Sequence, residues 1–152
     1  MLFFIYLGMF HKQLYKPIFP EKYSGDPTAI IMRSSWETRF ALWCDRNPSV
    51  IKWKSEETIV PYRCPTDDRL HRYFVDFQIQ VRQKDGLFKT FLIEVKPAKQ
   101  TLPPAYPGRQ TKRYITESLT YIKNQAKWKA ATEYCKDRGW QFKIITETEL
   151  GI

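Results

Sequence analysis

The chain has 152 residues, a length that favours one domain built around a single hydrophobic core. Hydrophobic residues make up 43% of the sequence and aromatic residues 16%, which excludes an intrinsically disordered chain. The formal net charge is +9, from 25 Lys and Arg residues against 16 Asp and Glu residues. This charge favours a polyanionic partner such as nucleic acid, because neutralising phosphates releases counterions; a solubilising surface is the alternative.

The cysteines and histidines indicate the redox setting and the kind of metal site to expect. Cys44, Cys64 and Cys135 are odd in number and widely spaced, which is typical of reduced thiols in a cytosol-like compartment. The two histidines, His11 and His71, do not lie near a cysteine in the sequence. We therefore expect no zinc site, and any bound metal should be held by oxygen ligands, which Mg2+ and Mn2+ prefer.

The first ten residues, MLFFIYLGMF, are strongly apolar. They are too few to span a bilayer, and they lack the basic start and the small-residue cleavage site of a signal peptide. An added strand or helix is one interpretation of this stretch, and an upstream extension with Met9 as the start is another. We assign residues 1–22 to an N-terminal extension and residues 23–152 to a single domain, with no membrane contact.

The first predicted elements are a turn and a helix. Residues 23–29, YSGDPTA, predict the turn. A helix should begin at Ser34, because Ser34 and Glu37 have the S-x-x-E spacing of a capping box, and Pro48 ends the pattern. Glu37 lies at the edge of the apolar stripe. That stripe comprises Trp36, Phe40, Trp43 and Cys44.

Strands are predicted next. Short strands are expected around residues 51–53 and 58–62. Residues 72–82, RYFVDFQIQVR, alternate between apolar and polar and predict one strand, and residues 87–96 predict another. The apolar face of the alternating strand comprises Tyr73, Val75, Phe77, Ile79 and Val81.

The remaining third of the chain predicts a loop, two helices and a final strand. Residues 97–112 are rich in proline and should form a basic, ordered loop. Helices are expected at residues 114–123 and 125–138, with Asn124 as the N-cap between them. Residues 140–147 should form the last strand. The order of helix, strands, helices and strand predicts an α/β domain with a mixed sheet.

A turn at residues 83–87 decides which residues of the two long strands face each other. A two-residue turn places Glu94 on the apolar face, because one step of register turns every side chain over. A three-residue turn with Gly86 in a left-handed conformation puts Asp76 directly opposite Glu94. This register, or one that differs by an even shift, matches the apolar faces: Val75, Phe77 and Ile79 lie opposite Val95, Ile93 and Phe91.

The predicted register brings two carboxylates together. Asp76 and Glu94 then lie within about 5 Å of each other at Cβ, and Lys96 projects from the same face. Like charges opposite each other destabilise a sheet unless a cation joins them, and a divalent ion could add to the charge of Lys96. Carboxylates that hold one or two Mg2+ ions beside a lysine are the arrangement that metal-dependent phosphodiester hydrolysis requires. The alternative is a surface salt bridge in which Lys96 only neutralises Glu94.

Several motifs resemble known nuclease families. Asp76, Glu94 and Lys96, preceded by a helix that carries Glu37, resemble the PD-(D/E)xK core of restriction-endonuclease-like enzymes. Longer stretches resemble the head completion nucleases of T-even-type tailed phages and, more loosely, the TnsA-type transposon end nucleases. They are YSGDP, RSSWE, SEETIVPY, RYFVDF, FLIEVKP, NQAKWKAA and FKIITE, and they cover residues 23–150.

The resemblance implies a restriction-endonuclease-like α/β core, a mixed sheet flanked by helices, with four residues at active-site positions. These are Glu37, Asp76, Glu94 and Lys96, of which the three carboxylates are the implied metal ligands. Glu37 has a competing interpretation as a capping-box residue alone, although the resemblance favours a metal role. For Glu56, an edge-strand charge is the default interpretation.

Basic residues cluster after Lys96 and predict a surface that grips the DNA backbone on either side of the cut without reading its sequence. Tyr106 and Trp128 lie among them, and Trp128 is expected in the core because it shares a helical face with Ala131 and Cys135. A solvated helix face is the alternative interpretation. The predicted DNA-binding residues are Lys99, Arg109, Lys112, Arg113, Lys123, Lys127 and Lys129.

The resemblance also implies a function. It implies an endonuclease dependent on Mg2+ (or Mn2+), with exonuclease activity left open, that acts when a DNA-filled phage head is made ready for tail attachment. The implied partners are double-stranded DNA and phage head or portal-vertex proteins. The implied location is the host cytoplasm during assembly, with the virion as a second location. The alternatives are a TnsA-like transposon end nuclease and a head-completion protein that binds DNA without cutting it.

Overall fold

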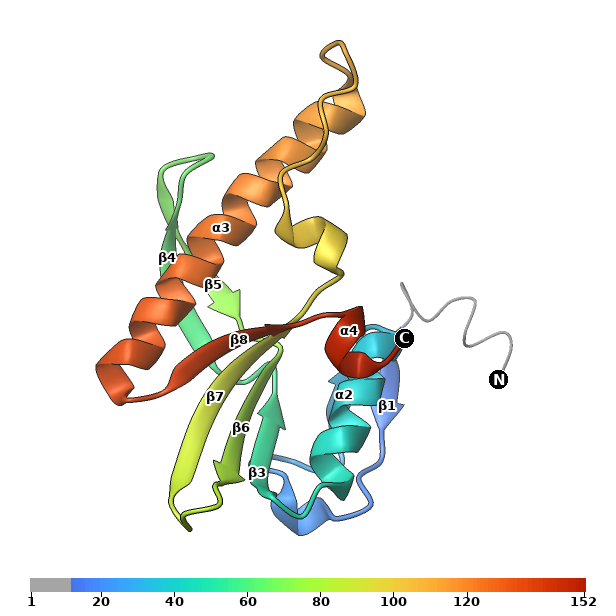
Figure 1. The fold of residues 1–152 in the computed structure, drawn as a ribbon, viewed down its shortest axis with the longest axis vertical. Helices are drawn as coiled ribbons and strands as arrows, with labels where there is room; N and C mark the ends of the chain where they lie inside the picture. The colour runs from blue at the N-terminus through green and yellow to red at the C-terminus, as the bar shows by residue number, and fades with distance from the viewer. Residues whose placement is uncertain (1–11) are drawn as a thin grey trace.

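A computed structural model describes residues 12–152 (Figure 1). The apolar stretch at residues 1–10, with the strand or helix considered for it, lies outside the described residues. The elements in chain order are β1 (Gln13–Tyr15), η1 (Pro20–Lys22), β2 (Ile30–Met32), α2 (Ser35–Arg46), β3 (Val50–Ser55), β4 (Ile59–Cys64), β5 (Arg69–Phe74), β6 (Phe77–Arg82), β7 (Phe88–Val95), η2 (Ala98–Thr101), α3 (Lys112–Arg138), β8 (Gln141–Ile145) and α4 (Glu147–Leu150).

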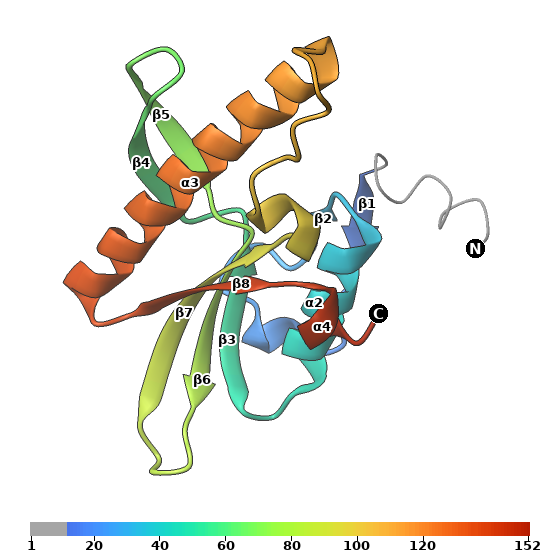
Figure 2. The same ribbon diagram turned by 45° about the horizontal axis from the view of Figure 1, so that its top comes forward.

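A four-stranded mixed sheet in the order β3-β6-β7-β8 forms the centre of the domain. β3, β6 and β7 are antiparallel, and β8 runs parallel to β7. α2 packs on one face of this sheet and α3 on the other (Figures 1 and 2). β1 pairs with β2, and β4 pairs with β5, as two smaller antiparallel sheets. The predicted α/β class with a mixed sheet flanked by helices is confirmed.

The central sheet divides the hydrophobic core into two clusters. The cluster on the α2 side includes Phe40, Cys44, Trp53, Phe77, Ile79, Ile93 and Val95. The cluster on the α3 side includes Val60, Tyr73, Val75, Leu92, Trp128, Ala131 and Cys135. Successive side chains of a strand point to opposite faces, so Glu94 shares the α3 side of β7 with Leu92.

The register of β6 and β7 is the predicted one. The ladder begins with Phe77 opposite Ile93 and continues without a shift to the turn. Gly86 in that turn has a φ of +83°, the left-handed conformation expected for a three-residue connection. Extending the same register by one residue beyond the ladder places Asp76 beside Glu94.

The single strand predicted for residues 72–82 was wrong, because two strands occupy that stretch. β5 and β6 are separated by Val75 and Asp76, and β5 pairs with β4 in a hairpin that packs against α3. Tyr73 and Val75 therefore belong to the α3-side cluster, whereas Phe77 belongs to the α2-side cluster. Alternation along a sequence reports which way side chains point, but it does not report a change of partner strand.

The two helices predicted after the proline-rich loop form one continuous helix, α3, of 27 residues. Asn124, the predicted N-cap between them, is buried inside α3, and the actual N-cap is Thr111. The loop itself contains η2. At 1.5 Å per residue, α3 is about 40 Å long, and its N-terminal part projects beyond the sheet (Figures 1 and 2). None of the helices in residues 12–152 is both long enough and apolar enough to cross a membrane.

α2 begins as predicted. Ser34 is the N-cap, and its Oγ accepts a hydrogen bond from the Glu37 N–H at 3.1 Å. Cys44 is buried, but Trp43 is 46% exposed, so the predicted apolar stripe was wrong at that position and Ala41 lies in the core instead.

Residues 13–22, which the sequence assigns to an extension, pack against α2. β1 pairs with β2, and Asp45 at the end of α2 is fully buried. The Asp45 carboxylate accepts three hydrogen bonds, from the Tyr15 hydroxyl (2.9 Å) and from the N–H groups of Ile18 (2.6 Å) and Phe19 (3.0 Å). These bonds fix the start of the described chain onto the domain.

Candidate active site

The four predicted site residues meet where the chain crosses from β5 to β6 and where β7 ends. Asp76 lies at the crossing, Glu94 lies in β7, Lys96 follows β7, and Glu37 lies in the first turn of α2. The charges of Glu94 and Glu37 both raise the pKa of Asp76. Three acidic residues that are far apart in the sequence are thus neighbours in the fold.

Glu94 is a buried carboxylate with two partners. It is 6% exposed, its Oε1 lies 3.4 Å from the Lys96 Nζ, and its Oε2 accepts a hydrogen bond from the Tyr73 hydroxyl at 2.6 Å. Burial of a charge is costly unless it is paired and hydrogen-bonded. The buried position of Glu94 does not fit the alternative of a solvent-exposed salt bridge.

Asp76 carries the clearest electrostatic signature of the site. Its Oδ2 accepts a hydrogen bond from the Val95 N–H at 2.8 Å. Burial raises the pKa of Asp76 well above its usual range, and the charges of Glu94 and Glu37 raise it further, while the Val95 N–H and Lys96 oppose them. Burial and the neighbouring carboxylates therefore disfavour the charged form of Asp76 when no cation is bound.

Glu37 both belongs to the start of α2 and faces the other carboxylates. Its N–H donates to the Ser34 side chain, and its Oε2 accepts a hydrogen bond from the Arg33 N–H at 2.8 Å. Burial raises the pKa of Glu37, the Arg33 N–H and guanidinium oppose this, and Glu94 adds to it. Glu37 can therefore both stabilise the first turn of α2 and belong to the carboxylate cluster.

The sequence did not identify Glu56 as part of this site. Glu56 follows β3, has a φ of +54°, and donates its N–H to the Asp76 carbonyl at 3.1 Å. Its Oε1 lies 2.7 Å from the Arg33 Nη1. Burial raises the pKa of Glu56, and Glu37 and Glu94 contribute. Glu56 directly follows β3, an edge strand of the central sheet, as the edge-strand interpretation expects, and it also lies beside the carboxylate cluster.

Tyr73 is a second residue that the sequence did not assign to the site. It is buried, and burial together with the charge of Glu94 raises the pKa of Tyr73 far above its usual range, so the hydroxyl stays protonated as a donor to Glu94. The Lys127 Nζ lies 5.7 Å from the centre of the Tyr73 ring. Tyr73 thus connects a basic residue of α3 with the carboxylates.

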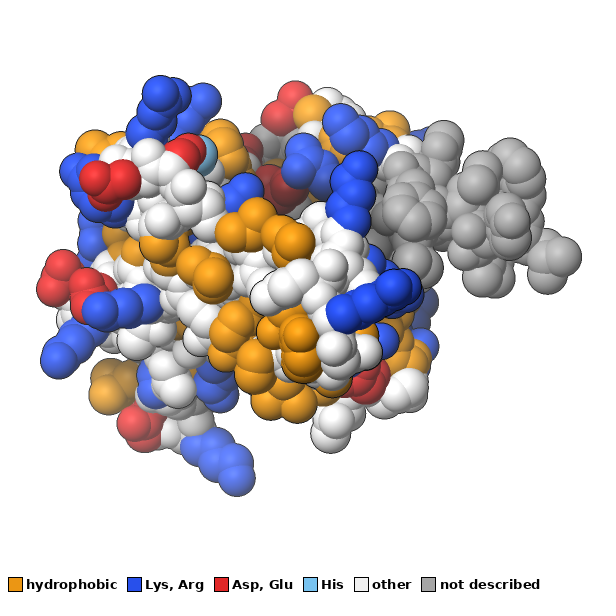
Figure 3. Space-filling view, turned by 90° about the horizontal axis from the view of Figure 1, so that it is seen from above, with side chains coloured by type: hydrophobic (Ala, Val, Ile, Leu, Met, Phe, Trp, Pro, Cys, Tyr) orange, Lys and Arg blue, Asp and Glu red, His pale blue; other side chains and the backbone are white. Residues whose placement is uncertain are grey.

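The predicted DNA-binding residues lie in η2, in the loop after it and in α3. All are exposed except Lys127, which is half-buried, and Arg113 pairs with Glu117 at 2.8 Å. Viewed from the projecting end of α3, Lys and Arg side chains stand out around the rim, with hydrophobic side chains between them (Figure 3). Tyr106, in the loop, is 58% exposed and packs edge-on against Tyr114.

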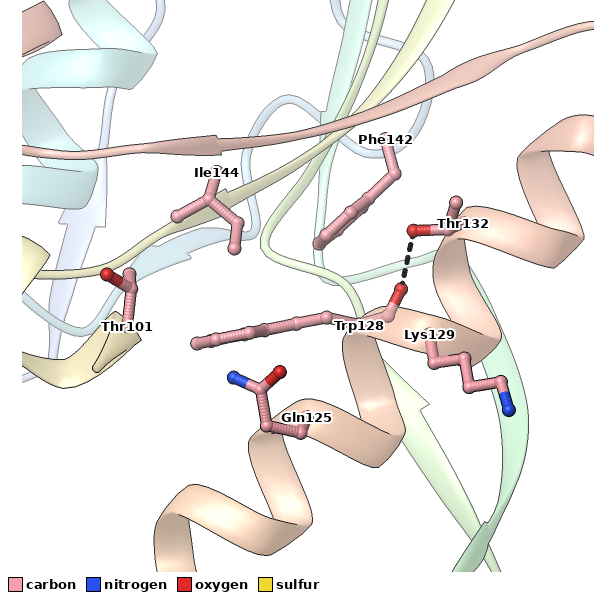
Figure 4. Close-up of a pocket in the computed structure, with 7 residues that line it drawn as sticks. All are labelled: Thr101, Gln125, Trp128, Lys129, Thr132, Phe142 and Ile144. Carbon is pink, nitrogen blue, oxygen red and sulfur yellow. Dashed lines mark hydrogen bonds between the residues drawn. The ribbon is translucent and has the colours of Figure 1, made fainter. Parts of the chain in front are cut away.

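A recess of about 500 Å³ lies between α3 and β8 (Figure 4). Trp128 projects into it from α3, and Phe142 and Ile144 line it from β8. The Thr132 hydroxyl donates a hydrogen bond to the Trp128 carbonyl at 2.7 Å. Trp128 is 6% exposed, which confirms its predicted place in the core. The recess adjoins the carboxylate site, because Ile144 lies directly opposite Glu94 in the β7–β8 ladder.

The β4–β5 hairpin corrects the expectation that no histidine lies near a cysteine. The Cys64 Sγ, a carboxylate oxygen of Asp67 and a ring nitrogen of His71 lie within 4.8 Å of one another. The expectation rested on distance along the chain, and the hairpin folds these residues back onto one another. Among residues 12–152, no other three acidic, histidine or cysteine side chains meet so closely.

The donors of the candidate active site suit a hard cation. Glu37, Asp76 and Glu94 offer carboxylate oxygens, which Mg2+ and Mn2+ prefer over nitrogen or sulfur. Burial, and to a lesser extent the charges of neighbouring carboxylates, raises the pKa values of Asp76 and Glu37, and a divalent cation would favour their charged forms. The oxygens of these three carboxylates do not all lie within 4.8 Å of one another in the described part of the chain.

The raised pKa values predict a specific pH dependence of the metal-free protein. A carboxyl whose pKa is higher in the folded than in the unfolded state destabilises the fold once pH rises above the usual carboxyl range near 4. Asp76→Asn should therefore raise the melting temperature in EDTA at pH 7.5 by a few degrees, since about 1 kcal/mol corresponds to roughly 2–4 °C in a domain of this size. The gain should vanish near pH 4. A difference that stays the same across this pH range would contradict the electrostatic account.

Two comparisons with known proteins bear on the family of this chain. The family described as "TnsA-like endonuclease N terminal" matches residues 47–147, a stretch that contains Asp76, Glu94 and Lys96. The "Head completion nuclease" of Enterobacteria phage T4 is 42% identical over 133 residues, which cover 85% of this chain and 86% of that protein. On the family match and the extent of this similarity, the chain belongs to the TnsA-like endonuclease N-terminal family.

Proposed function

We propose that the chain is a Mg2+-dependent DNA endonuclease that processes packaged DNA in phage head completion. The observation that carries this proposal is the buried Glu94 beside Asp76, with the Lys96 ammonium 3.4 Å from Glu94, in a member of an endonuclease family. The name of the T4 relative, head completion nuclease, supports this setting.

Glu37, Asp76 and Glu94 are the residues that would hold Mg2+, or Mn2+ in its place. When bound, the ion lowers the pKa of the attacking water and neutralises charge that develops on the phosphate. The chain orients these ligands through hydrogen bonds that it makes itself. The Val95 N–H fixes Asp76, and the Tyr73 hydroxyl fixes Glu94.

In this proposal Lys96 would act on the water or on the developing negative charge. Its side chain is 23% exposed, so its ammonium reaches the surface from which a DNA strand would approach. The pairing with Glu94 holds the ammonium in position before the substrate binds. A charged donor fixed in advance stabilises a transition state without reorganisation during the reaction.

The basic residues of η2, the loop and α3 would hold double-stranded DNA by its phosphates. The position of Lys127 over Tyr73, whose hydroxyl contacts Glu94, supports a path for DNA from α3 to the carboxylates.

In this proposal residues 23–152 are the nuclease domain. The further partners are phage head or portal-vertex proteins, and the protein acts in the host cytoplasm during assembly or within the virion.

A plasmid-nicking assay tests the proposal. Supercoiled plasmid incubated with the purified protein and Mg2+ should convert to nicked or linear forms, and EDTA should prevent this. Binding of the plasmid without any conversion, across Mg2+ and Mn2+ concentrations, would favour the non-cutting head-completion protein instead.

The family match favours a second candidate, a TnsA-like transposon end nuclease. Such an enzyme acts within a larger transposition complex. It should cut random plasmid DNA poorly on its own, and cutting at defined transposon ends should require partner proteins. Efficient nicking by the isolated chain would therefore favour the head-completion role.

The basic surface predicts a steep salt dependence of DNA affinity. Replacing Lys112 and Arg113 together by alanine should flatten the log–log salt slope by about one to two units, roughly one unit for each lost phosphate contact. The matched control replaces Lys84 and Lys89, near the opposite end of the molecule at the β6–β7 turn, and should leave the slope unchanged. Equal slopes for all three proteins would show that DNA does not contact the start of α3.

A further inference from the structure

A group of metal-type ligands lies at the tip of the β4–β5 hairpin. The hairpin pairs Tyr62 with His71 and Cys64 with Arg69, so Cys64 and His71 are diagonal neighbours on one face. Asp67 lies in the turn that joins the two strands. We propose that Cys64, Asp67 and His71 bind one Zn2+ ion, at a site distinct from the carboxylate cluster.

The donor atoms of this group suit zinc better than magnesium. Zn2+ takes thiolate sulfur, imidazole nitrogen and carboxylate oxygen, whereas Mg2+ takes oxygen almost alone. With Cys64 as a thiolate and Asp67 ionised, two negative charges match the charge of the ion. Three protein ligands leave the fourth tetrahedral position to water.

Hydrogen bonds within the turn orient the proposed ligands, Cys64 and Asp67, in the absence of an ion. Asp67 Oδ1 accepts from the Arg69 N–H at 3.0 Å, and the Asp68 N–H donates to the Cys64 carbonyl at 2.8 Å. Asp68 itself has a φ of +56°, which closes the turn. The Cys64 Sγ lies 3.1 Å from the Thr66 hydroxyl.

The site is open on one side. Cys64 is fully buried, whereas the side chains of Asp67 and His71 are 41% and 39% exposed, so an ion can enter from solvent toward the sulfur. The His71 Nε2 and Asp67 Oδ2 are 2.7 Å apart. A nitrogen and an oxygen ligand around tetrahedral zinc stand about 3.3–3.5 Å apart, given bonds of roughly 2.0–2.2 Å, so these two exposed groups must separate by about 0.6–0.8 Å.

The position suggests what the ion does. Cys64 packs in the α3-side cluster with Tyr62, while Ile59 at the other end of β4 lies near the crossing that carries Asp76. The two ends of β4 are five residue steps apart, or about 17 Å, so this ion would not take part in phosphate chemistry. It would fix the hairpin tip against α3.

Cobalt titration tests the proposal without DNA or nuclease activity. The metal-free protein, titrated with Co2+, should bind one ion that shows thiolate-to-cobalt charge-transfer absorption, and Zn2+ should displace it and raise the melting temperature. Cys64→Ser should eliminate the absorption. His71→Asn and Asp67→Asn change half-exposed side chains, and each should weaken the affinity for Co2+. Loss of a residue that only supports a metal ligand costs roughly 10–100-fold in metal affinity, so loss of a ligand itself should cost at least as much.

Two control variants show whether the absorption comes from the hairpin. Cys135→Ser removes another buried thiol and should keep the absorption, and Asp76→Asn disables the carboxylate site and should keep it as well. Absence of a thiolate–cobalt band in the parent protein would overturn the proposal. So would a band unaffected by both His71→Asn and Asp67→Asn, a result that does not depend on whether Cys64→Ser folds.

Discussion

Replacing Asp76 by asparagine is expected to abolish Mg2+-dependent DNA cleavage while the protein stays folded and still binds DNA. The asparagine carbonyl can still accept the hydrogen bond from the Val95 N–H, so the local backbone is retained. What is lost is one carboxylate charge among three, and with it a metal ligand. Cleavage of labelled duplex DNA should fall to the background of the assay, with near-unchanged binding by filter retention or gel shift.

The matched control for this variant is Asp85→Asn. Asp85 lies in the β6–β7 turn at the other end of the same hairpin, where its carboxylate accepts the Leu87 N–H. The control should cleave DNA at the rate of the parent protein. Near-parental cleavage by Asp76→Asn would remove Asp76 from the site and with it the assignment of the metal ligands.

Replacing Lys96 by alanine should leave Mg2+ binding intact and slow the chemical step. Removing one preorganised charged group typically costs about 2.7–4 kcal/mol of transition-state stabilisation, a factor of roughly 100 to 1,000 in rate. In the metal-free variant Glu94 has no ammonium partner, because Lys96 is gone. Added Mg2+ should therefore raise the melting temperature of the variant at least as much as that of the parent protein. Single-turnover cleavage and Mg2+-dependent melting measure the two effects separately.

Lys89→Ala is the control for the Lys96 variant, because Lys89 lies at the opposite end of β7. If Lys96 served only as a salt-bridge partner of Glu94, Lys96→Ala would lower the stability of the metal-free protein slightly and leave the single-turnover rate equal to that of Lys89→Ala. That outcome would leave the site without a group that acts on water or on the phosphate.

The part of the site that lies on β6 and β7 follows from local rules in the sequence. Gly86 permits the left-handed turn, and the apolar residues of both strands match in one register, which brings Asp76 beside Glu94. The start of α2 follows equally from Ser34 as an N-cap. These features depend on residues close in sequence or on a single strand pairing.

The parts that the sequence did not predict depend on contacts between distant segments. The break at Asp76 turns Tyr73 toward Glu94, and no periodicity signals a strand that changes partners. Asn124 resembles a cap locally, yet packing of α3 against the hairpin keeps one helix continuous through it. Glu56 joins the cluster through Arg33 and a left-handed backbone, which no pattern of residue types indicates.

The position of a bound divalent ion tests most directly whether Glu37, Asp76 and Glu94 hold the metal. Crystals grown or soaked with Mn2+, with Zn2+ excluded by chelation beforehand, would locate the ion by its anomalous scattering. The account predicts a peak coordinated by oxygens of Asp76 and Glu94, with Glu37 in direct or water-mediated contact and Lys96 beside it without coordinating it. A peak elsewhere on the chain, with these carboxylates still held only by Val95, Tyr73 and Lys96, would contradict it.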